Sequence, residues 1–275
     1  MNKREQQTIT TEVTYKDFKL YDRTTVKCNQ GFYTRMLDKA VDDLEAILSN
    51  HNKLNVVRFD LYFTLPDNPD NYVQIEPEKA NSYVSRFFKN LQDQMVSWTI
   101  PDKKTGKPKN RGLKRNQIAY QSAMEFSTGK LVHFHCYIAY KGLATDYPNK
   151  ETGISGSTLI DQHGEYIGIY DKIVETWKAV VPDGYGRVHF PIYKDEVNNI
   201  TYNNHFYSIG RTSDTFQADI EDCIYGLSYI CKVYSKNSIE VENARRFNSS
   251  QRVKRGHHSI ELKGKQSTEE QLEAA

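Results

Sequence analysis

Two histidines flank a phenylalanine in the apolar stretch LVHFHCYIAY, residues 131–140. Side chains alternate along a β-strand, so His133 and His135 would share one face while Phe134 and Cys136 would share the other. A histidine in an apolar run often only packs, but two imidazoles on one face of a strand can also bind a divalent cation. The pair therefore admits two interpretations, and a third ligand would favour metal binding.

Glu125 is the candidate third ligand, because it precedes His133 on the other strand of an expected hairpin. A three-residue turn at 128–130 would place Glu125 directly opposite His133, whereas a two-residue turn would place it on the other face. Two imidazoles and one carboxylate, without a thiolate, suit Mg²⁺ or Mn²⁺ and leave coordination positions open. The expected ligands are Glu125, His133 and His135, and Cys136 would point away from them.

A tyrosine-rich helix is expected over residues 218–237, with Tyr225, Tyr229, Lys232 and Lys236 on the face opposite its apolar residues. One interpretation is a solvated face. The other is a tyrosine nucleophile, which needs help at neutral pH because a free phenol has a pKa of about 10. A lysine and a metal-bound phosphate would supply that help. We expect Tyr229 to be the nucleophile, with Lys232 beside it and Tyr225 as a second candidate.

Three motifs occur in the order seen in the HUH endonucleases that initiate rolling-circle replication. They are LYFTLP with Thr64, the E…G…HFH group with Glu125, Gly129, His133 and His135, and YICK with Tyr229 and Lys232. Within that superfamily the chain most resembles the replication proteins of inoviruses (filamentous phages) and their prophage relatives, on the stretches SYICKVYSK and FNSSQRVKRG. The resemblance covers roughly residues 52–258.

The resemblance implies a ferredoxin- or RRM-like antiparallel sheet and a single-strand nick through a 5′-phosphotyrosine link. Carried over by position, the roles are metal binding for Glu125, His133 and His135, nucleophilic attack for Tyr229, and phosphate stabilisation for Lys232. Some members use two tyrosines four residues apart, and here the second would be Tyr225, since position 233 is valine. The implied partners are single-stranded or extruded origin DNA and the host helicase and polymerase.

The elements that must position these residues follow from hydrophobic periodicity. Helical spacing occurs at 32–50, 76–100, 166–181 and 218–237, and strand-like stretches occur at 55–65, 117–126, 130–140 and 184–193. Paired strands with separate helices predict an α+β fold with a central antiparallel sheet and helices packed on one side. The expected organisation is an N-terminal extension with one amphipathic helix (1–51), a nicking domain (52–240), and a basic, then disordered, tail (241–275).

Charge is nearly balanced, because the 275-residue chain has a net charge of only +2. Contacts to DNA must therefore come from local basic patches. The expected DNA-binding residues are Lys114 and Arg115 in the basic stretch 101–116, Lys236 after the tyrosine helix, and Arg245 and Arg246 in the tail.

The four cysteines are widely spaced and form no C-x-x-C pair, which argues against a zinc ribbon and a disulfide framework. No apolar segment approaches the length of about 18 residues that a membrane span needs. We therefore expect a cytoplasmic protein of a bacterial host cell, with no membrane partner. Two alternatives to a nicking enzyme stay open: a catalytically inactive DNA-binding regulator or origin-recognition protein on the same fold, and a small-molecule metallohydrolase.

Overall fold

The computed structural model describes most of the chain between its two ends. The described residues are 9–21, 30–65, 68–97, 99–101, 105, 107–110, 112–126, 131–142, 168–195, 200–203, 205–233, 247–251, 253–256 and 258–264.

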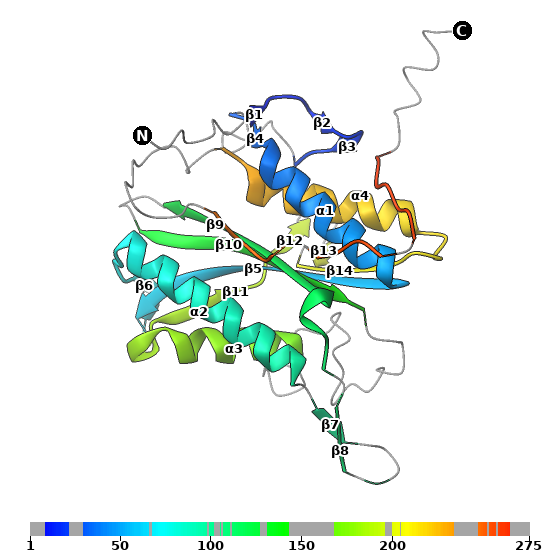
Figure 1. The fold of residues 1–275 in the computed structure, drawn as a ribbon. Coiled ribbons are helices and arrows are strands. Elements are labelled where there is room, and N and C mark those ends of the chain that lie inside the picture. The colour runs from blue at the N-terminus through cyan, green and yellow to red at the C-terminus, as the bar shows by residue number, and fades with distance from the viewer. Residues whose placement is uncertain are drawn as a thin grey trace, which may run out of the picture.

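The described residues form a seven-stranded antiparallel sheet at the centre of the molecule (Figure 1). Its path runs β11–β5–β10–β9–β15, and β14 and β6 also pair with the long strand β5. The bounds are β5 Lys53–Leu65, β6 Asn68–Tyr72, β9 Ile118–Phe126, β10 Val132–Lys141, β11 Gly186–His189, β14 Phe206–Gly210 and β15 Phe247–Ser249. The predicted α+β fold with an antiparallel sheet is confirmed.

Among the described residues, four α-helices cover the sheet, two on each face (Figure 1). They are α1 Thr34–Asn50 and α4 Phe216–Ser228 on one face, and α2 Pro77–Val96 and α3 Ile169–Val180 on the other. The expectation that the helices pack on one side was therefore wrong. The physical reason lies in the central strands, which carry apolar residues on both faces, so each face needs a cover.

Two hydrophobic cores result from this three-layer arrangement. Val57, Phe59 and Leu61 of β5 are fully buried in the core that includes residues of α2 and α3. Leu54 and Val56 of the same strand lie in the core with residues of α1 and α4. Towards its C-terminal end, β5 carries polar side chains on the face that α1 and α4 cover. The candidate site lies among these side chains.

Short strand pairs and turns complete the description. They are β1 Ile9–Thr10 with β4 Phe32–Tyr33, β2 Thr14–Tyr15 with β3 Phe18–Lys19, β7 Thr99–Pro101 with β8 Pro108–Asn110, β12 Ile192–Asp195 with β13 Ile200–Asn203, and the 3-10 turns Arg115–Gln117, Pro182–Gly184 and Tyr229–Cys231. The β7–β8 hairpin, which holds part of the basic stretch 101–116, projects away from the sheet (Figure 1). No helix of the described residues is long and apolar enough to cross a membrane.

The segments before residue 52 and after residue 240 both contribute to the core. Phe18 and the buried side of α1 belong to the α1/α4 core. Near the other end of the chain, β15 pairs with β9, and the backbone N–H of Leu262 donates to Glu45 of α1 at 2.9 Å. The range 241–275 thus includes a strand of the sheet and a segment packed on α1, and not only a tail.

Candidate metal centre

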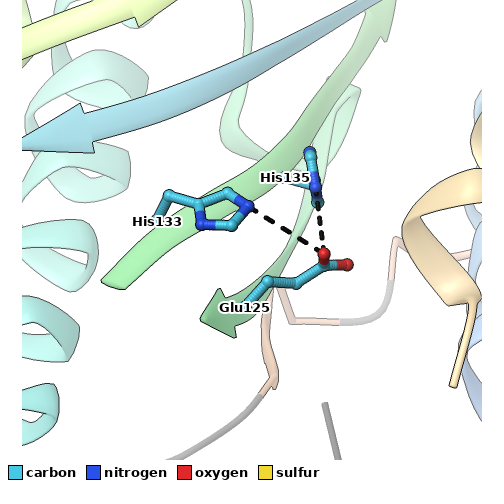
Figure 2. A group of neighbouring side chains, drawn as sticks. All are labelled: Glu125, His133 and His135. Atoms are coloured by element: carbon cyan, nitrogen blue, oxygen red, sulfur yellow. Dashed lines mark ion pairs between the residues drawn. The ribbon is translucent and has the colours of Figure 1, made fainter. Parts of the chain in front are cut away.

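Glu125, His133 and His135 converge at the ends of two neighbouring strands (Figure 2). Glu125 lies directly opposite His133 in the β9–β10 register, as a three-residue turn would require. The carboxylate oxygen Oε2 of Glu125 is 3.2 Å from Nε2 of His135 and 3.9 Å from Nε2 of His133. The register on which the predicted ligand set depends is therefore confirmed, although residues 127–130 lie outside the described part of the chain.

The distances between these ligand atoms would allow a cation to bind after a small movement of the side chains. Two ligand atoms about 2.1 Å from an ion and about 90–110° apart are separated by about 3.0 to 3.4 Å. The three ligand atoms lie within 4.8 Å of one another, so a closure of an ångström or so brings all of them into range. Two imidazoles and one carboxylate form a donor set for a divalent ion with open positions. This cluster can hold a metal ion.

Strand alternation separates Cys136 from the ligands, as predicted. Phe134 and Cys136 are fully buried in the core under α2 and α3, on the face opposite His133 and His135. Burial raises the pKa of the Cys136 thiol well above its usual value. A neutral thiol on the far side of the sheet is a packing residue.

Asp60 contacts this cluster, although it was not predicted from the sequence. It pairs with His135 in the β10–β5 register, and its Oδ1 lies 2.5 Å from Nδ1 of His135. Burial raises the pKa of Asp60, but His135, His189 and Arg58 outweigh burial and hold that pKa well below its usual range. The carboxylate can therefore accept a proton from Nδ1 of His135, which is the usual support for a metal-binding histidine, while Nε2 of the same ring faces Glu125.

His133 is held differently from His135. Its ring stacks on Tyr62 of β5, with centroids 5.4 Å apart and planes 10° apart. Burial and the neighbouring His135 lower the pKa of His133 to about 4, so its imidazole is neutral at pH 7. Because a neutral imidazole is the form that binds metal, His133 is ready to act as a ligand.

Tyr229 and Lys232 lie beside the cluster, but not on a regular α-helix. The expected helix 218–237 ends at Ser228, and a 3-10 turn follows over Tyr229–Cys231. Residues three apart in such a turn eclipse each other, so Lys232 returns over Tyr229. Its Nζ lies 3.5 Å from the centre of the Tyr229 ring, which contacts the His135 ring edge-on at 5.2 Å between centroids.

Lys232 is buried, so the interpretation of its helix face as a solvated one does not hold for this residue. The side chain is 1% exposed, and its Nζ is 3.1 Å from Oε1 of Glu125 and 3.5 Å from Nε2 of His135. Glu125 therefore presents Oε2 to the two histidines and Oε1 to Lys232. This ion pair orients the carboxylate and reduces the negative charge that the cluster carries.

Tyr225 lies one helical turn before Tyr229, and both rings contact Tyr21 from the N-terminal segment. Tyr21 stacks on Tyr225 at 5.1 Å and meets Tyr229 edge-on at 4.9 Å between centroids. Its backbone N–H donates to the Ser228 hydroxyl at 2.8 Å. Of the two candidate nucleophiles, Tyr229 is the one whose ring contacts a predicted metal ligand.

The predicted DNA-binding residues lie away from this cluster or outside the described residues. Lys114 and Arg115 are exposed, and Arg115 forms an ion pair with Asp93 of α2. They precede Ile118, at the end of β9 opposite Glu125, and seven strand steps correspond to about 23 Å. Lys236, Arg245 and Arg246 lie outside the described residues.

Comparison with known proteins identifies a family. A family model described as the YagK/YfjJ C-terminal domain matches residues 14–250, which include all three candidate metal ligands, Tyr229 and Lys232. The search of curated proteins and the search of solved structures found no significant match. Because the family model matches most of its length, the chain belongs to the YagK/YfjJ C-terminal domain family.

Proposed function

We propose that this protein is a metal-dependent, site-specific single-strand DNA endonuclease of the HUH type, which starts rolling-circle replication of a phage or prophage. One observation carries the proposal. A carboxylate–histidine–histidine cluster, a tyrosine ring and a buried lysine meet in one place: Nζ of Lys232 is 3.1 Å from Glu125, and the Tyr229 ring contacts His135 at 5.2 Å.

The chain's own groups would prepare the site for a phosphodiester. Glu125, His133 and His135 would hold Mg²⁺ or Mn²⁺, with His135 oriented by Asp60. When bound, the cation supplies positive charge that neutralises the scissile phosphate. Lys232 would keep the Glu125 carboxylate oriented and add positive charge beside the Tyr229 ring.

In the proposed reaction the hydroxyl oxygen of Tyr229 attacks the phosphorus of the scissile phosphodiester. The new bond is tyrosine oxygen to phosphorus, and the bond that breaks is phosphorus to the 3′-oxygen. The phenol proton is lost and the departing 3′-oxygen gains one, so the products are a 5′-phosphotyrosine and a free 3′-hydroxyl. No net hydrolysis occurs, and the reverse reaction can rejoin the strand without ATP.

The proposed substrate is single-stranded or extruded origin DNA, with the host helicase and polymerase acting after the nick. A randomised single-stranded oligonucleotide pool, incubated with Mn²⁺ or Mg²⁺, tests the proposal without knowledge of the origin. We expect covalent protein–DNA adducts, and sequencing the trapped strands would reveal the preferred site. Tyr229→Phe should abolish the adduct, while Tyr185→Phe, at a tyrosine directly before β11, should keep it.

A second candidate function is DNA binding without catalysis. The buried ion pair between Lys232 and Glu125 favours this function, because an ammonium 3.1 Å away can balance the charge of the carboxylate without a metal. In that case the pool would be retained by the protein, Mn²⁺ would not bind measurably, and no adduct would form. Loss of the adduct in Tyr225→Phe but not in Tyr229→Phe would instead show that Tyr225, one helical turn earlier, is the nucleophile.

A further inference from the structure

Arg58 places a second buried cation beside the tyrosine. It lies on β5, two residues before Asp60 and on the same face, opposite Tyr137 in the β10 register. The residue is 6% exposed, and its guanidinium carbon lies 4.6 Å from the centre of the Tyr229 ring. Its Nε is buried, and no described group is its hydrogen-bond partner.

A buried guanidinium needs an anionic partner to offset the cost of its burial. Burying a charge is costly unless the charge is paired and hydrogen-bonded. Within the described residues, no carboxylate forms an ion pair with Arg58, and the two oxygens of nearby Asp60 face His135 and His189. Lys232, by contrast, has Glu125 as its partner. Arg58 is therefore the cation at the Tyr229 ring with donor capacity left for a substrate.

We propose that Arg58 is a phosphate-binding residue: it binds the non-bridging oxygens of the phosphodiester that Tyr229 attacks, and of the phosphotyrosine that results. The inference rests on the proposed function for the identity of the phosphate. Phosphorus keeps its two non-bridging oxygens while the bond to the 3′-oxygen is replaced by the bond to tyrosine. The planar fork of a guanidinium matches two such oxygens in both states, which a lysine cannot do.

The first experiment measures anion binding without requiring a nick. Inorganic phosphate is titrated into the full-length protein with bound Mn²⁺, and binding is followed by the broadening of the ³¹P signal. Arg58→Lys should weaken phosphate binding about tenfold, because a charge-assisted pair of hydrogen bonds is replaced by a point charge. The matched control is Arg86→Lys, an exposed arginine that also lies over a tyrosine ring, Tyr83, at 5.0 Å.

The second experiment uses the strands trapped by wild-type protein, with a phosphorothioate in each of its two configurations at the scissile position. Wild-type protein should prefer one configuration, and Arg58→Lys should lose that preference while its Mn²⁺ affinity and unfolding midpoint stay close to wild type. Arg58→Gln should lower the rate of adduct formation further. A packing role alone would change the unfolding midpoint and leave the preference intact.

The two proposals fail in different ways. Phosphate binding that depends on Arg58, in a protein that forms no adduct, would overturn the proposed nicking activity and retain the anion site. Adducts that form equally in wild-type and Arg58→Lys protein, with equal phosphate affinity, would overturn the role of Arg58 and retain the nicking activity.

Discussion

The contact between Asp60 and His135 predicts how strongly the site binds metal. Asp60→Asn removes the negative charge that accepts the Nδ1 proton of His135 across 2.5 Å, in a place where both side chains are buried. An asparagine can still accept one hydrogen bond, but its amide can also turn and present a donor to His135. A second variant, Asp60→Ala, removes the hydrogen-bond acceptor of Nδ1 completely.

The magnitude follows from the support that outer partners give to metal ligands. Loss of such a partner typically costs about 10- to 100-fold in metal affinity. We expect Asp60→Asn to lower the metal affinity about 10-fold and Asp60→Ala about 100-fold, because only the alanine variant leaves Nδ1 of His135 without an acceptor. Both variants should also be less stable, since the depressed pKa of Asp60 shows that the folded protein stabilises its charged form.

Isothermal titration with Mn²⁺, performed well below the unfolding midpoint of each variant, separates the two effects. The matched control is Asp93→Asn, which also removes a paired carboxylate, but one on the exposed side of α2. Its Mn²⁺ affinity should equal that of wild type. A folded Asp60→Ala protein that binds Mn²⁺ as tightly as wild type would refute the view that Asp60 orients His135.

Three further predictions concern stability and selectivity. Gly226→Ala should lower the free energy of unfolding in urea by about 1–3 kcal/mol, because a Cβ would lie 1.9 Å from the Tyr207 hydroxyl; a second change, Tyr207→Phe, should recover part of the loss, and full stability of the single variant would contradict the packing. Burial raises the pKa of Asp43 to about 6 from 3.8, despite Lys39. The folded state therefore binds the proton of the Asp43 carboxyl more tightly than the unfolded state does. The free energy of unfolding should fall by at most about 3 kcal/mol as pH rises from about 4 to about 6, and Asp43→Asn should remove this pH dependence. Cys136→Ala should cost about 1 kcal/mol of stability and leave Mn²⁺ affinity unchanged; a change in metal preference would mean that the thiol reaches the site.

The local parts of the site were readable from the sequence, because they depend on short-range geometry. Strand alternation put His133 and His135 on one face and Cys136 on the other, and the structure agrees. The position of Glu125 depended on the length of one turn, and the observed register matches the three-residue alternative.

The tyrosine segment shows where local periodicity was insufficient. A continuous helical pattern through residue 237 placed Lys232 beside Tyr229 on the face opposite the apolar residues, but it did not predict that this lysine is buried. In the structure the chain leaves the α-helix at Ser228, and the backbone N–H of Val233 donates to the carbonyl of Gly31 at 2.8 Å, so the buried Lys232 lies against the Tyr229 ring. That contact joins residues about two hundred positions apart, and no periodic pattern records it.

Sequence alone thus predicted the antiparallel α+β class and the shared face of His133 and His135, because both rest on the spacing of neighbouring residues, and it named Glu125 as the third ligand on the condition of a three-residue turn. Tertiary structure alone decided that helices cover both faces of the sheet, that Asp60 contacts His135, and that Arg58 and Lys232 lie against the Tyr229 ring. The pairing of β5 with β10 brings Asp60 and Arg58 into the site, and strand pairing across 75 residues is set by the packing of the whole sheet.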